Sequence, residues 1–196
     1  MVEQKDNKLP NQPGSWFLNR GLFSDHFLKA RLPQWKEWQS EGELATFRKQ
    51  LSSLYESAKT ILPLSNEAQT EKEFVQPVLD LLGYANSYIV QAPTQVGEHT
   101  NRPDYALFPD QPTKNKAYEK LKNNDYTLCI GVADAKYWQR ELDFAKSSDR
   151  DTFSNQNPSF QIASYLIGTK QTWGILTNGR LWRLYCAKSH LPLGNY

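Results

Sequence analysis

The spacing of hydrophobic residues predicts four helices in this chain. In each of them apolar side chains recur every three or four positions, which gathers them on one helix face. Pro63 follows the longest segment and Gly83 follows the next one, and both residue types end helices. Ser65 is the expected N-cap of that second segment, and Pro77 is expected to kink or divide it. The predicted helices cover residues 24–32, 42–62, 65–82 and 159–169.

The fourth helix begins after Asn157, with Pro158 at its first helical position. Gln161 and Tyr165 stand one turn apart on one side of this helix. A neighbouring side carries the residues expected to form its core stripe. They are Phe160, Ala163, Ser164 and Ile167.

Runs of apolar, β-branched and aromatic residues predict five strands. The last two flank the Asn178-Gly179 turn and form an expected β-hairpin. A polar, lysine-rich insertion at 110–125 separates the second strand from the third, with a single helical turn expected at 118–121. This order predicts an α/β core with a mixed sheet, preceded by N-terminal helices. The predicted strands cover 88–96, 103–108, 126–138, 173–177 and 181–186.

A length of 196 residues fits one domain with an N-terminal appendage. The expected divisions are a disordered lead-in at 1–15, a helical segment at 16–64 and the main domain at 65–190. No apolar run is long enough to span a membrane and no secretory signal opens the chain, which predicts a cytoplasmic protein without a membrane partner. Cys129 and Cys186 are then expected to be buried free thiols.

One short stretch combines a buried strand with charged residues. Asp134 and Lys136 end the third predicted strand, and their spacing of two directs both side chains to one face. Burying a carboxylate and an ammonium is costly unless they pair or hold a metal ion. Taken alone, the two residues are equally well explained as an ordinary ion pair at a sheet edge.

A second carboxylate comes from the neighbouring strand. Asp104 begins the second predicted strand, so that it and Asp134 are expected at one end of the sheet. Carboxylate oxygens are the ligands that Mg²⁺ and its substitute Mn²⁺ prefer. The backbone carbonyl of Ala135 is the expected third ligand, and Glu71 of the preceding helix is expected to complete the acidic cluster. Glu67, one turn earlier, is the rival candidate on that helix.

These residues carry a resemblance to a known family. Pro103-Asp104 followed by Asp134-Ala135-Lys136 resembles the PD-(D/E)XK nuclease superfamily, and the element order is similar to its αβββαβ core. Gln161 and Tyr165 match the QxxxY motif of one subgroup. Four further stretches resemble the N-terminal nuclease domain of type I and fused type II restriction-modification enzymes. They are Asn66–Glu71, Pro77–Tyr84, Arg102–Phe108 and Trp173–Trp182.

The resemblance implies a Mg²⁺-dependent endodeoxyribonuclease domain of a restriction-modification enzyme. Its implied catalytic residues are Asp104, Asp134, Lys136, Glu71, Gln161 and Tyr165, and its implied metal ligands are Asp104, Asp134, Ala135 and Glu71. Relatives more often carry glutamate where this chain has Asp134, which alters the reach to a metal. Implied partners are DNA and the methyltransferase or helicase and target-recognition domains of a longer parent protein.

Two other functions remain open. The same fold serves as a non-catalytic DNA-binding or assembly module, although the presence of both carboxylates and the lysine favours activity. The aromatic segment 16–38 and the tryptophan-rich hairpin also fit an interaction scaffold. A net charge of +2 neither requires nor excludes nucleic acid. Candidates for contacts to phosphates, each equally explained as a surface charge, are Arg102, Arg140, Lys146, Arg150 and Arg180.

Overall fold

The computed structural model describes residues 18–39, 41–91, 102–143 and 157–188. The chain forms two compact units, 1–39 and 40–196, so the long helix α1 (Glu41–Ala58) belongs to the same unit as the sheet. The predicted lead-in at 1–15 lies outside the described residues, as do the end of the first predicted strand and the phosphate-contact candidates Lys146 and Arg150.

The first unit contains three short helical turns, η1 (Phe27–Arg31), η2 (Leu32–Gln34) and η3 (Lys36–Gln39). The hydroxyl oxygen of Ser24 accepts a hydrogen bond from the backbone N–H of Phe27 at 3.1 Å, as expected for a helix cap. Pro33 lies inside η2 instead of following a helix. Proline is tolerated there because the first positions of a helical turn need no N–H donor.

A five-stranded mixed sheet forms the centre of the second unit, with strand order β1-β2-β3-β4-β5. Neighbouring strands are antiparallel except for β3 and β4, which run parallel. The predicted α/β class, the mixed sheet and the C-terminal hairpin are therefore confirmed. The strands are β1 (Tyr88–Val90), β2 (Tyr105–Leu107), β3 (Gly131–Ala135), β4 (Trp173–Thr177) and β5 (Trp182–Cys186).

The central strand β3 is shorter than the predicted 126–138. A turn precedes it, closed by a 2.9 Å hydrogen bond from the N–H of Cys129 to the carbonyl of Tyr126. After Ala135 the backbone makes one more bond to β4, from the Lys136 N–H to the Thr177 carbonyl, and then leaves the sheet. Lys136 therefore lies just beyond the end of the strand.

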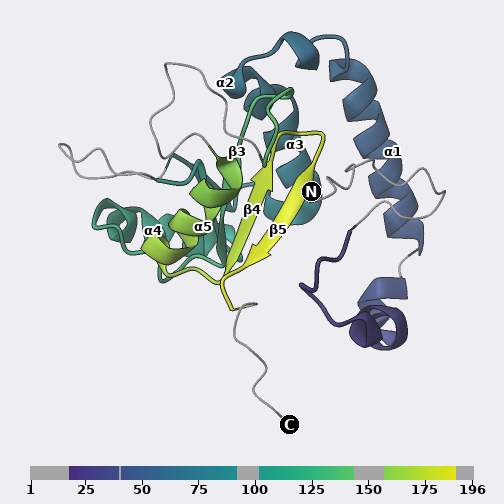
Figure 1. The fold of residues 1–196 in the computed structure, drawn as a ribbon, viewed down its shortest axis with the longest axis horizontal. Coiled ribbons are helices and arrows are strands. Elements are labelled where there is room, and N and C mark those ends of the chain that lie inside the picture. Colours follow the sequence, from purple (N-terminus) through teal and green to yellow (C-terminus); the bar gives the residue numbers. More distant parts are fainter. Residues whose placement is uncertain (1–17, 40, 92–101, 144–156, 189–196) are drawn as a thin grey trace, which may run out of the picture. The chain divides into compact units, whose positions relative to one another are not determined.

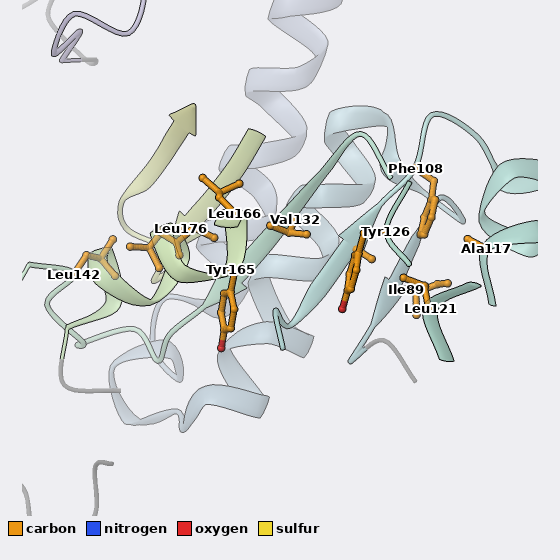
Figure 2. Packing of buried hydrophobic residues seen from close by; sticks show 12 residues of the cluster. Ile89, Phe108, Ala117, Leu121, Tyr126, Val132, Leu142, Tyr165, Leu166 and Leu176 are labelled. Atoms are coloured by element: carbon orange, nitrogen blue, oxygen red, sulfur yellow. The ribbon is translucent and has the colours of Figure 1, made fainter. Parts of the chain in front are cut away.

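Helices cover both faces of this sheet (Figure 1). On one face α4 (Gln111–Lys122) packs next to β1, and α5 (Pro158–Thr169) packs against β3 and β4. Figure 2 shows this core, in which Tyr165 lies between Leu142 and Tyr126. On the other face, Val75 and Leu79 of the helical segment 67–84 pack on β2 and β3. α1 packs on the outside of that segment through Ala58 and its neighbours.

The helical segment at 67–84 runs through α2 (Glu67–Thr70), η5 (Glu71–Val75), α3 (Gln76–Leu79) and η6 (Asp80–Tyr84). Its N-cap is Asn66 and not Ser65, because Asn66 exchanges hydrogen bonds with Gln69 in a capping box. Pro77 does not divide the segment: the wide turn η5 comes just before it and the backbone stays helical. Gly83 ends the helix with a φ of 93°, as its position predicted.

The core stripe predicted for α5 is wrong. Phe160 and Ile167 are 72% and 78% exposed, whereas the side chains of Gln161, Ile162 and Tyr165 are buried. The hydrophobic spacing allowed either side of this apolar helix to face the sheet. The side that carries the two polar residues of the motif is the one that packs against β3.

The insertion at 110–125 contains a full helix and not the single turn predicted. Asp110 caps α4 by accepting a hydrogen bond from the N–H of Thr113 at 2.7 Å. Ala117 and Leu121, one turn apart, are its buried contacts with the core.

Cys129 and Cys186 are free thiols and half-buried. Within the described ranges, no helix is long and apolar enough to cross a bilayer.

Candidate functional site

The register of β2 and β3 brings the two predicted strand carboxylates together. Tyr105 pairs with Ala133 and Ala106 with Val132. One further step of this antiparallel register sets Asp104 opposite Asp134. The Asp104 carboxylate also accepts a hydrogen bond from the N–H of Ala135 at 2.8 Å, which fixes Asp104 beside the end of β3.

Asp134 is a buried carboxylate with few polar contacts. Its residue surface is 1% exposed, and its two carboxylate oxygens are shielded from solvent. Its charge contact is Lys136, whose Nζ lies 2.8 Å from Oδ2. Burial raises the pKa of Asp134 well above its usual range, the Lys136 charge opposes that rise, and the nearby Asp104 charge adds to it.

The pKa of Lys136 shows whether the surroundings of this cluster favour positive or negative charge. Its side chain is 11% exposed, and burial by itself lowers the pKa of a lysine. The pKa of Lys136 is nevertheless raised, because the charges of Asp134, Glu67 and Asp104 outweigh burial. The electrostatic potential at the ammonium is therefore negative, which means that the carboxylates of the cluster favour positive charge at this position.

The two helix glutamates approach this cluster in different ways. Glu71 accepts a 2.5 Å hydrogen bond from the hydroxyl of Tyr105, whereas Glu67 interacts electrostatically with Lys136. Burial raises the pKa of both glutamates. The Lys136 charge lowers the pKa of Glu67, and the hydrogen bond from Tyr105 lowers that of Glu71, in each case less than burial raises it. Both carboxylates therefore border the cluster, each with a different partner.

Gln161 and Tyr165 reach the same cluster from α5. The Gln161 side-chain amide donates a 2.8 Å hydrogen bond to the Tyr165 hydroxyl, as their spacing of one helical turn permits. Burial raises the pKa of Tyr165, and the charges of Asp134 and Asp104 raise it further. The hydroxyl of Tyr165 is therefore a neutral group within range of the charges of both carboxylates.

The chain after Lys136 is tied to the rest of the site by buried polar contacts. The N–H of Trp138 donates to the hydroxyl of Thr70 at 3.3 Å, next to Glu71 in the helix. The side-chain amide of Asn178, in the β4–β5 turn, donates to the carbonyl of Arg140 at 2.7 Å. Both Thr70 and Asn178 are fully buried, so this segment is held on two sides.

The structure thus gathers every predicted site residue around the ends of β2 and β3. Lys136 contacts Asp134, and Asp104 is the neighbour of both; the charge of Asp104 acts on Glu71 and Tyr165, and Gln161 is linked to the cluster through Tyr165. The prediction that the Ala135 carbonyl binds a metal stays a prediction; its N–H binds Asp104. Among the described residues, no group of three or more His, Cys, Asp or Glu side chains has the geometry of a metal site.

Two residues of the site were not recognised from the sequence. Tyr105 is the hydrogen-bond donor to Glu71, and its place directly after Asp104 on β2 was the available signal. Arg140 is not the surface charge that the sequence also allowed: it is 4% exposed, and its charge lowers the pKa of Glu67, while its contact with a phosphate stays a prediction. Arg180 is exposed as expected, and Arg102 is half-buried with its charge close to Tyr126.

The residues present fit a hard divalent cation in their chemistry. Asp134 has two buried carboxylate oxygens, of which Oδ2 contacts Lys136, and Asp104 stands beside it. Oxygen atoms of this kind are the ligands of Mg²⁺ and Mn²⁺, and a cation would supply the positive charge that the field at Lys136 favours. Lys136 occupies the position next to Oδ2 and Glu71 is engaged by Tyr105, so a cation has to compete with or rearrange these contacts.

No family model, curated protein or solved structure matches this chain. Its chemistry is therefore argued from the residues and geometry of the site.

Proposed function

We propose that this chain is a Mg²⁺-dependent endodeoxyribonuclease domain with a restriction-endonuclease-like αβββαβ core. The observation that carries the proposal is the pairing of the half-buried Asp104 with the buried Asp134, beside a lysine whose pKa is raised against the effect of burial. The order of the helical segment 67–84, β1, β2, β3, α5 and β4 agrees with such a core, with α4 inserted and β5 added. The proposed parent is a restriction-modification enzyme.

Asp104 and Asp134 are the proposed ligands of the cation, with Glu71 at the edge of the site. Mg²⁺ bound there would lower the pKa of a water molecule and offset charge on the phosphate that is attacked. Hydrolysis adds that water across one P–O bond of DNA and leaves a phosphate and a hydroxyl end. The buried surroundings of Asp134 strengthen these electrostatic effects because little water screens them.

Lys136 acts as a cation in this proposal and not as a base. Its raised pKa keeps the ammonium protonated in the metal-free chain, so Lys136 can donate hydrogen bonds to a phosphate oxygen. Glu67 is the carboxylate that remains near this ammonium if Asp134 turns to a cation. The hydrogen-bonded pair Gln161 and Tyr165 presents a neutral hydroxyl to the same space and orients the groups around Asp134.

A second candidate function is a non-catalytic DNA-binding or assembly module on the same fold. The specific observation that favours it is that the described residues contain no ready-made cluster of three metal-binding side chains. In this case the Asp134–Lys136 ion pair is structural, and DNA binding depends on surface charges such as Arg180.

Cleavage of supercoiled plasmid DNA by the purified chain separates the two functions. With Mg²⁺ or Mn²⁺ present we expect nicking by the wild type and its loss in Asp134→Asn, by at least about 100-fold. The control is Asp25→Asn, which makes the same chemical change at an exposed carboxylate of the first unit. DNA binding by the wild type without any cleavage, at all metal concentrations, would favour the binding module.

A further inference from the structure

Tyr105 joins the central sheet to the helix that carries Glu71. Its side chain is fully buried on β2, and its hydroxyl donates a 2.5 Å hydrogen bond to Glu71 Oε2. The same hydroxyl accepts a longer hydrogen bond, 3.4 Å, from the side-chain amide of Gln76. Both hydrogen-bonding capacities of the phenol are thus used, one by each partner, and the position of its proton is set.

The ring of Tyr105 has little freedom to move. It packs in the core cluster that also contains Val75 and Leu79, and it meets the ring of Tyr88 edge to face with centroids 5.7 Å apart. A hydrogen-bond donor on a rigid ring restricts the orientation of the side chain that accepts its hydrogen bond. The flexible, half-buried side chain of Glu71 is therefore held at one of its two oxygens.

The other oxygen of Glu71 is left available. No hydrogen bond or ion pair engages Oε1 of Glu71 in the described part of the chain, and the Glu71 carboxylate lies close enough to Asp104 for the two charges to interact. Groups that hydrogen-bond a metal-binding carboxylate orient it, and their loss typically weakens metal binding by about 10- to 100-fold. Tyr105 is such a group for Glu71, because its hydroxyl donates a hydrogen bond to the Glu71 carboxylate.

We infer that Tyr105 is a positioning residue, whose buried hydroxyl holds the Glu71 carboxylate at the edge of the site and thereby increases the affinity of the site for a divalent cation. The inference rests on the proposed function, since it requires that the cluster binds such a cation. It also distinguishes the two helix glutamates: Glu71 is oriented by Tyr105, whereas Glu67 interacts with the charge of Lys136.

The test is a calorimetric titration of the full chain with Mn²⁺ in the absence of DNA. We expect Tyr105→Phe to raise the Kd for Mn²⁺ about tenfold. Glu71→Gln is expected to raise it as well, and the double variant is expected to be no weaker than Glu71→Gln alone, because Tyr105 acts through Glu71. Tyr88→Phe is the matched control, since it removes a hydroxyl from the ring packed against Tyr105 without touching Glu71.

A further variant guards against misfolding of Tyr105→Phe. Glu71→Asp keeps the carboxylate and the tyrosine but shortens the side chain by one methylene, and it is expected to weaken Mn²⁺ binding similarly. An unchanged or lower Kd in Tyr105→Phe, or additive losses in the double variant, would overturn the inference while leaving the proposed function intact. A wild type that binds no Mn²⁺ and cleaves no DNA would overturn both.

Discussion

Asp104 lies opposite Asp134 across the β2–β3 pair, and it also accepts the N–H of Ala135 at 2.8 Å. Burial raises the pKa of Asp134, and the nearby charge of Asp104 raises it further. A cation bound between the two carboxylates would offset this cost of ionisation.

The first prediction concerns the stability of Asp134→Asn. The pKa of Asp134 is higher in the folded chain than in the unfolded chain, so the folded state holds the proton more tightly. The wild type therefore gains stability as the pH falls through the folded pKa toward the ordinary aspartate range, and at neutral pH it bears the cost of a buried charge. In Asp134→Asn the Lys136 ammonium loses its 2.8 Å partner, but the charges of Glu67 and Asp104 continue to favour it, so we expect this variant still to raise the free energy of unfolding at pH 7, by about 1 kcal/mol.

Thermal unfolding at several pH values measures this effect. An increase of about 1 kcal/mol corresponds to a melting temperature higher by about 2–4 °C for a chain of this size. The gain is expected to shrink as the pH approaches 4, and Asp25→Asn is expected to show no gain. A variant that is less stable than the wild type at neutral pH would contradict the assignment of Asp134 as an unfavourably buried charge.

The second prediction concerns Lys136→Met, which has the opposite effect on stability. Removing the ammonium leaves Asp134 buried without its 2.8 Å charge partner, which is expected to cost about 3 kcal/mol without metal. The competition between Lys136 and a cation for Asp134 also disappears. Binding of Mn²⁺ is therefore expected to be at least as tight as in the wild type, and saturating Mn²⁺ should restore much of the lost stability.

Cleavage distinguishes the role of Lys136 from that of a metal ligand. We expect Lys136→Met to bind Mn²⁺ but to lose plasmid nicking, whereas Asp134→Asn loses both. Lys122→Met, at an exposed lysine of α4, serves as the control for the substitution. Wild-type rates of nicking in Lys136→Met would exclude a part for its ammonium in the reaction.

The third prediction tests which side of α5 faces the sheet. Ile162 is fully buried against the core, and Ile162→Ala is expected to lower the free energy of unfolding by about 2–5 kcal/mol. Phe160 is exposed, and Phe160→Ser is expected to change it by less than about 0.5 kcal/mol. Urea denaturation of both variants measures the difference. Equal losses would mean that the helix packs in another rotation.

The fourth prediction concerns Gly179 in the β4–β5 turn. Its φ of +83° is unfavourable for other residues, and a Cβ there would lie 2.8 Å from the ring of Trp138. Gly179→Ala is expected to destabilise the chain by about 2 kcal/mol. Gly42→Ala, where a Cβ meets no atom within 4 Å, is the control and is expected to cause no loss in the same urea experiment.

Local sequence rules predicted the parts of this fold that depend on neighbouring residues. The Asn178-Gly179 turn gave the hairpin, and Gly83 adopts the left-handed conformation expected at a helix end. The convergence of Asp104 and Asp134 was predictable too, because consecutive strands usually pair and both residues stand at strand ends. These features need only a few residues to specify them.

Features that depend on long-range packing were not predictable in this way. The sequence of α5 is apolar on more than one side, so only its contact with β3 selects the side of Ile162 and Tyr165. The contact between Tyr105 and Glu71 spans 34 positions and depends on how the helical segment 67–84 crosses the sheet. The burial of Arg140 likewise depends on the segment after Lys136, which is hydrogen-bonded to Asn178 of the β4–β5 turn.

The most direct test of the central claim is the anomalous scattering of Mn²⁺ in crystals of the wild type grown with manganese. We predict one strong peak between Asp104 and Asp134 and no peak there in crystals of Asp134→Asn. A map without manganese at this position, with Lys136 still paired to Asp134 in saturating Mn²⁺, would contradict the claim. The cluster would then be a structural ion pair, and the DNA-binding module would be the better account of this chain.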